Sequence, residues 1–472
     1  ISRQLVWGHQ IPVWYNKNDK SKIHVSVKGP DDVENWEQEE DVLDTWASSW
    51  LWPLGVHDWP NNNKELDKFF PTNTLVTGPD IIFFWVARMI VTGYEFLGDK
   101  PFSDVYFTSI LRDESGKKLS KSLGNSPDPF DLFEEYGTDA VRFGVMLMAP
   151  QGLDVLFSKD RLEIGRNFMN KLWNACRFVD MNKPSGWNDK ELIASQRLEL
   201  ADKWILNRLE RAIKNYNNQI ERFHFNESAK VLYDFIWNDF CDWYIEIAKT
   251  RFYSEYSDSK VSTYNTCVKC IRIILPLLHP YTPFITEELW SYFKDKDQPD
   301  LIISSWPEQK SEFDLEIDNE MEILQGIISS VRAIRSRMNI PPSKKIDLKV
   351  KCSDSQSDFI ANNSQFIITL AKLESYESSE SMQKPSQSAA SVIHGMEIYV
   401  PLEGLVDLDK ERSLLLKRKT KIKELLIVIE KKLLNDKFID NAPLKVVEGE
   451  KEKEITLKDE LEKINSNLGM LL

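Results

Sequence analysis

The period at which apolar residues recur changes along the 472-residue chain, and each period predicts a different element. Residues 74–77 and 105–111 are short apolar runs that predict buried strands, and residues 81–96 between them predict a largely apolar helix. A polar loop that contains glycine follows each strand. Ligands bind at such loops in open α/β sheets, at the carboxyl ends of the strands. We therefore predict an α/β domain over residues 1–150.

From about residue 160, apolar and aromatic residues recur every three or four positions, which is the period of a helix with one buried face. Long helices are predicted over residues 162–179, 200–223, 226–253, 261–275 and 283–293. A helix bundle over residues 151–330 is the simplest fold that buries these faces. Its aromatic residues are expected to lie mainly in the core.

A smaller unit is expected over residues 331–405. Residues 346–350 and 396–401 predict strands, and residues 364–373 predict a helix. The stretch 377–390 is rich in Ser, Gln and Glu and is expected to be a loop. Together these elements predict a small α/β module.

The last segment, residues 406–472, has the spacing of a coiled coil. Apolar residues recur every seven positions in its first half and at alternating steps of four and three in its second half: Leu408, Leu415, Ile422 and Ile429, then Leu457, Leu461, Ile464, Leu468 and Leu471. Pro443 lies between the two halves, where proline is unfavourable inside a helix. We therefore predict an antiparallel hairpin of two helices.

Composition limits the function classes. No apolar stretch is long enough to cross a bilayer and the first residues show no secretory pattern, so we expect a soluble, cytoplasmic protein rather than a membrane protein. Cys267 and Cys270 have the spacing of half a zinc site. No second Cys or His pair lies at ligand spacing, which favours helix packing of both thiols, so no structural zinc or other metal site is predicted.

The formal net charge of −14 argues against a uniformly basic nucleic-acid-binding surface. Between Lys410 and Lys432, however, nine basic and three acidic residues give a local charge of +6. Most charged helix faces are simply solvated. A basic arm on an acidic body nevertheless favours salt-sensitive contacts with an RNA backbone, and the candidate residues are Lys417, Arg418, Lys419, Lys421 and Lys423.

The segment after the 105–111 strand, hereafter the lysine loop, reads Gly116-Lys117-Lys118-Leu119-Ser120-Lys121-Ser122-Leu123-Gly124-Asn125. Lys118 and Lys121 lie three residues apart among serine hydroxyls, and the glycines permit backbone angles that other residues avoid. Such a loop can surround a polyphosphate with positive charge and hydrogen-bond donors. A solvated surface turn has the same composition, so the loop alone leaves both interpretations open.

Lys118 to Ser122 resemble the Lys-Met-Ser-Lys-Ser loop of class I aminoacyl-tRNA synthetases, with Leu119 replacing methionine at similar volume. Residues 1–12 resemble a stretch shared by the valyl and isoleucyl enzymes of this family. Other segments across the chain resemble the valyl branch: residues 41–49, 78–88, 168–179, 202–208, 305–307, 335–342 and 438–447. The combination of these segments is more specific than any one of them.

The resemblance implies a multidomain α/β plus α architecture. Its parts would be the carboxyl-terminal half of a Rossmann-like catalytic nucleotide-binding domain (1–150), an α-helical anticodon-binding bundle with a connecting segment (151–330), the small α/β module (331–405) and an antiparallel coiled-coil hairpin that serves as a tRNA-binding arm (406–472). The implied activity is the ATP-dependent activation of valine and its transfer to tRNA(Val). Mg²⁺ would come with the nucleotide, and the enzyme is expected to be a monomer.

The resemblance also implies roles for single residues. The lysine loop would stabilise the pyrophosphate leaving group electrostatically, through Lys118, Ser120, Lys121 and Ser122. Asp80, close to Gly78 in the ATP site, would accept hydrogen bonds from the adenosine ribose. The alternative is a helix N-cap before Ile81, and both roles can coexist because the carboxylate has two oxygens. Trp46 and Trp85 would line the valine pocket, with core packing as the alternative.

The sequence also departs from the family pattern. It contains no His-x-Gly-His motif and no editing domain. We therefore expect the carboxyl-terminal portion of a synthetase, inactive alone. Two alternatives stay open. One is the isoleucyl branch, but the helical hairpin without a cysteine-pair zinc module argues against it. The other is a non-catalytic tRNA-binding protein derived from a synthetase. The missing histidine motif favours the latter, whereas the intact lysine loop and the tryptophan pair disfavour it.

Overall fold

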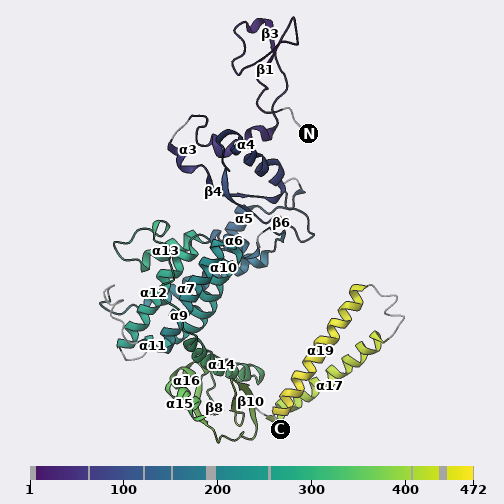
Figure 1. The fold of residues 1–472 in the computed structure, drawn as a ribbon. Helices are drawn as coiled ribbons and strands as arrows, with labels where there is room; N and C mark the ends of the chain where they lie inside the picture. The colour runs from purple at the N-terminus through teal and green to yellow at the C-terminus, as the bar shows by residue number, and fades with distance from the viewer. Residues whose placement is uncertain are drawn as a thin grey trace. The chain divides into compact units, whose positions relative to one another are not determined.

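The computed structural model describes residues 7–61, 64–120, 123–149, 152–187, 198–253, 257–405, 408–434 and 444–470 (Figure 1). Its contacts divide the chain into two compact units. The first comprises Ile1–Asn170, Asn215–Leu232 and Leu278–Ile285, and the second comprises Lys171–Lys214, Tyr233–Leu277 and Thr286–Leu472. Within the described ranges, no helix is both long and apolar enough to cross a membrane.

The first unit begins with a small antiparallel sheet that the apolar pattern did not predict. β1 (Val13–Asn16) pairs with β2 (Ile23–Val25) and β3 (Trp36–Gln38) in the order β2-β1-β3, and the 3₁₀ turn η1 (Val33–Asn35) precedes β3. None of these short strands has a fully buried side chain. Their alternation is therefore too short and too weak to predict a strand.

A pair of parallel strands follows three short helices, α1 (Thr45–Ser49), α2 (Trp52–Gly55) and α3 (Lys64–Phe69). β4 (Thr72–Thr77) pairs with β5 (Phe102–Phe107), and the chain between them forms η2 (Pro79–Ile81), the π-helical η3 (Ile82–Val86) and α4 (Ala87–Leu97). Buried side chains of Val86, Met89 and Phe102 join the helical segment to β5. The predicted order of strand, helix and strand is confirmed, but the second strand covers 102–107 instead of 105–111, and Leu111 belongs to a separate strand.

Next, β6 (Leu111–Arg112) pairs in parallel with β7 (Val155–Leu156), and α5 (Pro129–Tyr136) and α6 (Thr138–Met148) lie between them in sequence. α7 (Lys159–Met181) approaches α6 closely at two glycines. A Cβ on Gly165 would overlap the carbonyl O of Ala140, and a Cβ on Gly144 would lie 2.8 Å from the carbonyl O of Arg161. Only glycine fits these positions without a shift of the backbone.

The helical period is confirmed by α7, α9 (Leu200–Glu221), α10 (Phe225–Asp234), η5 (Phe235–Ile245), α11 (Glu246–Phe252), α12 (Ser257–Leu278) and α13 (Pro283–Phe293). The predicted 226–253 helix contains a π-helical stretch, η5, which apolar periodicity does not reveal. Cys267 and Cys270 are buried in α12, and burial raises the pKa of both thiols. Among the residues that the structure describes, no group of three or more Cys, His, Asp or Glu side chains could hold a metal ion.

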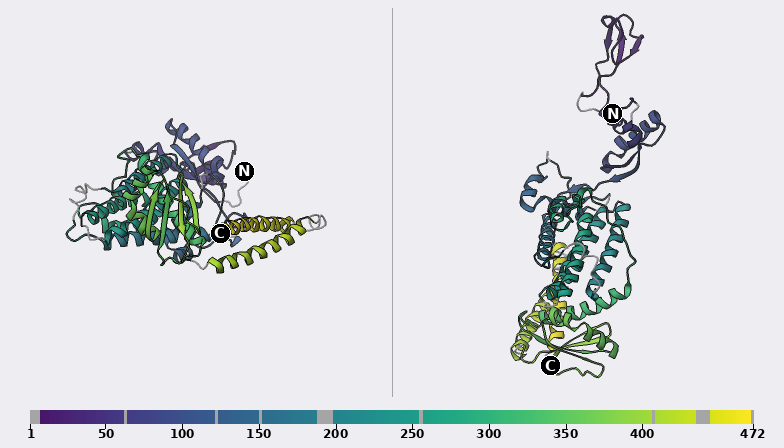
Figure 2. Two further views of the ribbon diagram at one scale, coloured as in Figure 1. Left: turned by 90° about the horizontal axis from the view of Figure 1, so that it is seen from below. Right: turned by 90° about the vertical axis from the view of Figure 1, so that its left-hand side faces the viewer.

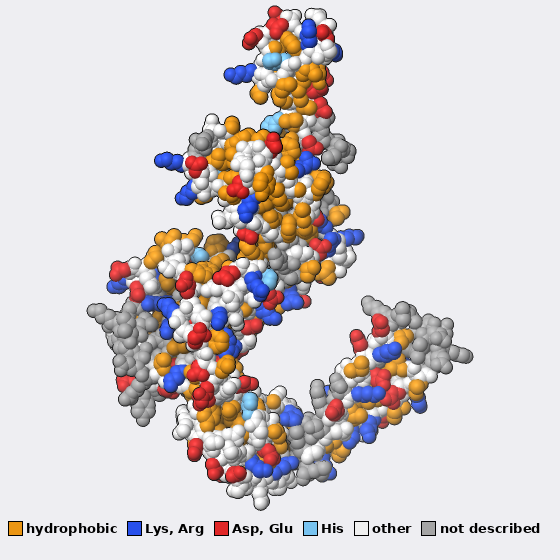
Figure 3. Space-filling view, in the orientation of Figure 1, with side chains coloured by type: hydrophobic (Ala, Val, Ile, Leu, Met, Phe, Trp, Pro, Cys, Tyr) orange, Lys and Arg blue, Asp and Glu red, His pale blue; other side chains and the backbone are white. Residues whose placement is uncertain are grey.

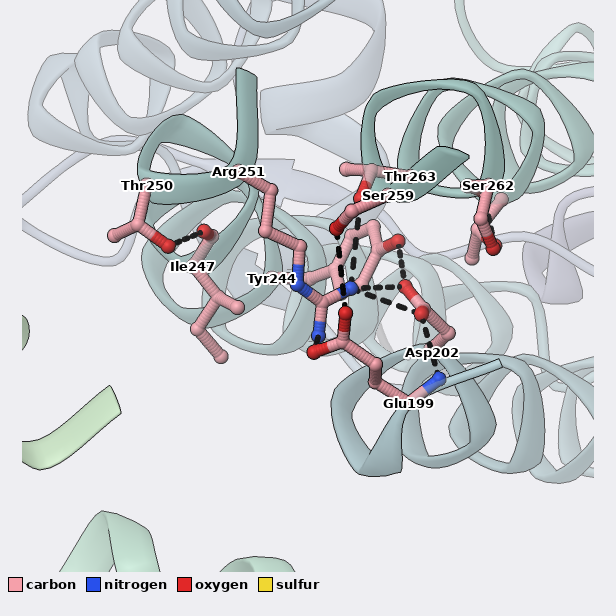
Figure 4. A network of polar contacts seen from close by, with 10 residues as sticks. Glu199, Asp202, Tyr244, Ile247, Thr250, Arg251, Ser259, Ser262 and Thr263 are labelled. Carbon is pink, nitrogen blue, oxygen red and sulfur yellow. Dashed lines mark hydrogen bonds and ion pairs between the residues drawn. The ribbon is translucent and has the colours of Figure 1, made fainter. Parts of the chain in front are cut away.

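A buried ion pair links α9 to α11 in the second unit, and Tyr244 of η5 joins it (Figure 4). Arg251 Nη1 donates to both carboxylate oxygens of Asp202 at 2.8 Å, and the Tyr244 hydroxyl donates to Asp202 Oδ1 at 2.6 Å. Arg251 Nη2 also lies 2.7 Å from Glu199 Oε2. Burial alone lowers the pKa of Arg251, but Asp202, Tyr244 and Glu199 raise it above its usual value. The guanidinium therefore stays charged inside the bundle.

After η6 (Leu301–Ile303) and α14 (Leu315–Arg337), a four-stranded sheet has the order β10-β11-β8-β9. Its strands are β8 (Ile346–Lys351), β9 (Leu373–Ser379), β10 (Ser388–Ile393) and β11 (Met396–Pro401), and α15 (Asp354–Asn362) and α16 (Ser364–Ala371) connect β8 to the parallel β9. The predicted 377–390 loop is wrong at both ends, because β9 and β10 extend into it. Ser388 and Ala389 are buried there, so packing overrides a polar, small-residue composition.

α17 (Leu408–Leu433) and α19 (Leu444–Met470) lie side by side (Figures 1 and 2). Ile422, Leu426 and Ile464 are buried between them, and Leu457, Leu461 and Leu468 pack against this cluster. Lys458 Nζ lies 3.4 Å from Glu430 Oε1, which fits two helices that run in opposite directions. The side chains of Leu408, Leu415 and Leu471 lie outside the described residues.

Candidate functional site

Asp80 and Lys118, which are 38 positions apart, meet in the first unit. Lys118 Nζ donates to Asp80 Oδ2 at 2.7 Å, and both side chains are more than half exposed. Asp80 lies in η2, which follows β4 and Gly78. The N-cap residue of η2 is Gly78 and that of η3 is Ile81, so Asp80 caps neither helix. The capping alternative for Asp80 is therefore wrong. The space over the Cα of Gly78 is open, since a Cβ there would meet nothing within 4 Å.

Asp113, the first residue after β6, forms a hydrogen-bond hub three residues before the lysine loop. Its Oδ1 accepts hydrogen bonds from the backbone N of Ser115 and of Lys117, both at 2.9 Å, and from the Ser115 hydroxyl at 2.7 Å. Its Oδ2 accepts a hydrogen bond from Asn125 Nδ2 at 2.7 Å. The hydrogen bonds from Ser115, Asn125 and Lys117 lower the pKa of Asp113 to about 2, so its carboxylate is charged at neutral pH.

Asn125 holds the other end of the lysine loop. Its Oδ1 accepts a hydrogen bond from the backbone N of Ser120 at 2.9 Å, and its Nδ2 also donates to the carbonyl O of Lys118 at 3.2 Å. Gly116 and Gly124 have φ values of +82° and +66°, which justifies glycine at both positions. Lys121 and Ser122 lie outside the described residues.

Asp113 and Asn125 were not predicted as site residues, although a sequence signal was present. Asp and Asn beside glycine commonly hydrogen-bond to nearby backbone groups in turns. Asn125 directly follows Gly124, and Asp113 lies three residues before Gly116. The signal indicates a turn, however, and does not show that the two side chains bond to one another.

Trp46 and Trp85 lie in elements that contact each other, α1 and η3. The Trp46 ring stacks on Phe84, with ring centroids 5.7 Å apart and 22° between the planes. Trp85 Nε1 donates to the carbonyl O of Ser49 at 2.8 Å, and its ring packs against the Val86 cluster. Both indoles are half-buried, and Trp85 is also part of the hydrophobic core.

An apolar surface is exposed around these elements. Val76, Phe83, Val91 and Tyr94 are each more than half exposed, and they come from β4, η3 and α4. Figure 3 shows hydrophobic side chains gathered over this part of the chain. Parallel strands are normally covered on both faces, so such exposure around a two-stranded parallel sheet is unusual.

The predicted RNA-contacting residues all lie on α17. Lys417, Arg418, Lys421 and Lys423 are exposed, and Lys419 is partly exposed. The partner helix α19 carries five basic and seven acidic residues. The positive charge of the helix pair is therefore concentrated on one of its two helices.

Three family models match successive parts of the chain. Residues 22–158 match tRNA synthetases class I (I, L, M and V), residues 202–351 match the anticodon-binding domain of tRNA ligase, and residues 407–472 match the valyl tRNA synthetase tRNA binding arm. The third match agrees with the valyl rather than the isoleucyl branch.

Individual relatives give the same result. The Valine--tRNA ligase of Oceanobacillus iheyensis is 42% identical over 100% of this chain and 53% of its own length, and that of Enterococcus faecalis is 42% identical over 98% and 52%. A solved LeuRS from Agrobacterium radiobacter K84, in a ternary complex with tRNA and LeuAMS, has a TM-score of 0.50 at 18% identity. The match covers 65% of this chain and 42% of the LeuRS chain, and it supports the fold alone. The chain spans about half the length of the curated relatives. Their agreement with the three matched domains shows that the chain belongs to the valyl-tRNA synthetase family.

Proposed function

We propose that the chain supplies the carboxyl-terminal half of a valine–tRNA ligase, which activates valine with ATP and transfers it to tRNA(Val). Family membership supports this proposal. The observation that carries it is the Lys118–Asp80 contact at 2.7 Å, because two residues expected to bind opposite ends of ATP lie within reach of one small ligand. We expect the complete enzyme to act as a monomer in the cytoplasm.

In the proposed ATP site, Asp80 accepts hydrogen bonds from the ribose hydroxyls and Gly78 lets the nucleotide approach the backbone. Lys118 and Lys121, with the hydroxyls of Ser120 and Ser122, stabilise the charge that develops on the departing pyrophosphate. ATP then replaces the exposed Lys118–Asp80 ion pair with phosphate contacts at Lys118 and ribose contacts at Asp80. Mg²⁺ accompanies the nucleotide and needs no dedicated protein cage.

In the proposed valine pocket, Trp46 and Trp85 form an apolar slot that excludes larger side chains. The stacking of Trp46 on Phe84 and the hydrogen bond of Trp85 to Ser49 support fixed ring positions. An apolar slot discriminates poorly against an isosteric side chain that adds a hydroxyl, and valine against threonine is itself the standard example of this limit. A separate editing activity is therefore expected in the complete enzyme.

The helical parts would bind tRNA(Val). The bundle is proposed to approach the anticodon, and the coiled-coil hairpin formed by α17 and α19 would contact the outer corner of the tRNA. The exposed Lys417, Arg418, Lys421 and Lys423 and the partly exposed Lys419 suit phosphate contacts, which release counterions. Such contacts position the RNA and do not read its sequence.

Two observations support the inference that the catalytic site is incomplete in this chain. The sequence has no His-x-Gly-His motif. The apolar surface around β4, η3 and α4 is exposed where an α/β sheet would be covered. The missing motif also favours a second candidate function, that of a tRNA-binding protein without catalysis.

Valine-dependent exchange of pyrophosphate into ATP distinguishes the two candidates. We expect no exchange with the chain alone. A chimera that joins the chain to the part of the Oceanobacillus iheyensis relative left uncovered by the match should show exchange with valine and little with isoleucine. Exchange by the chain alone would contradict the half-site proposal. A folded chimera that binds tRNA but lacks exchange would favour the non-catalytic alternative.

A further inference from the structure

One side-chain contact joins the residue that follows β6 to the end of the lysine loop. Asp113 follows β6 and Asn125 is the last residue of the loop, and Asn125 Nδ2 donates to Asp113 Oδ2 at 2.7 Å. This hydrogen bond between a charged acceptor and an amide adds to backbone bonds at the same place, where Asp113 N donates to the carbonyl O of Lys117 at 2.8 Å and Leu119 N donates to that of Leu111 at 3.2 Å. We refer to this pair as the Asp113–Asn125 clamp.

The clamp also holds the backbone on both sides of Lys118. Asp113 Oδ1 accepts from the backbone N of Lys117, and Asn125 Oδ1 accepts from that of Ser120, both at 2.9 Å. Asn125 Nδ2 further reaches the carbonyl O of Lys118 at 3.2 Å. The main chain of Lys118 is therefore held by the clamp together with its antiparallel bridge to Arg112, while its side chain extends to Asp80 and is more than half exposed.

The chemistry of the two side chains suits this arrangement. A carboxylate only accepts hydrogen bonds, which matches the donors of Ser115, Lys117 and Asn125. An amide both donates and accepts, which lets Asn125 bond to Asp113 and to the loop backbone at once. Neither side chain is bonded to Lys118 Nζ, which donates to Asp80.

We propose that Asp113 and Asn125 are positioning residues that hold the lysine loop so that Lys118 is aimed at the nucleotide site before ATP binds. The proposal rests on the function proposed for Lys118. Ordering a glycine-containing loop in advance removes an entropy cost that would otherwise fall on the binding or chemical step. The clamp would thus act through Lys118 without contacting the substrate.

Exchanging the two side chains tests this proposal. Asn125→Asp removes the donor of the clamp and places two carboxylates side by side. Asp113→Asn removes the charged acceptor and places the NH₂ groups of two amides side by side. The double variant Asp113→Asn with Asn125→Asp restores the bond between the two residues and loses only the bond to the Lys118 carbonyl. Asn61→Asp is the matched control, because Asn61 Nδ2 donates to Asp58 Oδ2 at 3.1 Å in an exposed turn outside the loop.

The first readout is tryptic cleavage after Lys117 and Lys118 in the 472-residue chain, followed by mass spectrometry. Opening of the loop should raise the rate on the order of tenfold in each single variant, since a hydrogen bond to a charged group is lost. The double variant should recover most of the protection and the control should not change. Unchanged loop cleavage in both single variants, or an equal rise at lysines throughout the chain, would overturn the proposal.

The second readout is exchange kinetics in the chimera, normalised to active sites. Each single variant should lower kcat on the order of tenfold and raise KM for ATP, with KM for valine unchanged and with recovery in the double variant. Wild-type kcat in both single variants would also overturn the positioning role. If the unmodified chimera shows no exchange, the proposed function fails, whereas proteolysis still decides whether the clamp holds the loop.

Discussion

Single residues in this chain show that the burial of a charged side chain decides how much its pairing contributes to stability. Asp202 is fully buried and Arg251 is almost so, and each satisfies the other through two hydrogen bonds. Lys249, on the same helix, pairs with Glu246 at 2.5 Å while both side chains are about 40% exposed. A buried charge left without its partner is costly, whereas an exposed pair contributes little.

Arg251→Leu should lower the free energy of unfolding by about 3–5 kcal/mol, because the carboxylate of Asp202 stays buried without its cation. Urea unfolding followed by far-UV circular dichroism measures this change. Lys249→Ala, the matched control, should cost less than about 1 kcal/mol. Adding Asp202→Leu to Arg251→Leu should restore much of the loss, and a double variant as unstable as the single one would contradict this account.

Lys118 is expected to act only when charge develops on the phosphates. In the chimera, Lys118→Ala should lower the rate of valine-dependent exchange by roughly 10²–10³-fold, the usual effect of removing one group that stabilises a developing anion. Lys117→Ala is the control, since Lys117 contacts Asp113 through its backbone N, which alanine retains. Equal losses in the two variants would show that the loop needs general positive charge and not Lys118 in particular.

At the scale of elements, glycine has opposite effects in two helices. Gly165 in α7 meets the backbone of α6 at Ala140, whereas a Cβ on Gly449 in α19 would meet nothing within 4 Å. The first glycine permits helix packing. The second glycine makes no close contact and only destabilises the helix, because glycine loses more backbone entropy than other residues when it folds.

Gly165→Ala should therefore destabilise the first unit by about 1–3 kcal/mol, since α6 and α7 must move apart. Gly449→Ala should stabilise α19 by up to about 1 kcal/mol, because alanine favours the helix. Thermal unfolding of both variants beside the unchanged chain gives the two signs. A neutral Gly165→Ala would mean that the two helices adjust without loss of packing.

At the scale of the whole molecule, charge is separated along the chain. The net charge is −14, yet residues 410–432 carry +6. An acidic body repels RNA in general, so a basic helix can select where the RNA backbone makes contact. Salt dependence measures how many phosphate contacts such a helix makes.

Reversing Lys417, Arg418 and Lys421 to Glu should weaken tRNA binding and reduce the slope of log K against log salt by roughly 2–3, if each residue meets one phosphate. Filter binding across salt concentrations provides both values. Reversing Lys20, Lys22 and Lys28, which are exposed near β2, changes the net charge equally and should affect binding less. Equal weakening by both triple variants would assign the effect to net charge instead of the arm.

Features that depend on neighbouring residues could be read from the sequence. The 3.6-residue period predicted the bundle helices, and the lysine loop and the basic run were visible as local patterns. The resemblance carried by several such segments indicated the family that the comparisons then showed. Local propensity and periodicity arise within a few residues, which explains why they survive in the sequence.

Tertiary structure decided what depends on distant partners. The 38-residue separation of Asp80 and Lys118 gives no local sign that their side chains meet, and the bond between Asp113 and Asn125 depends on how the whole loop closes. Ser388 belongs to a strand only because its neighbours bury it. The sequence by itself determined the helices, the charge pattern and the family of this protein. Long-range packing alone determined which of its polar side chains meet, because that choice is made by contacts between segments and not within them.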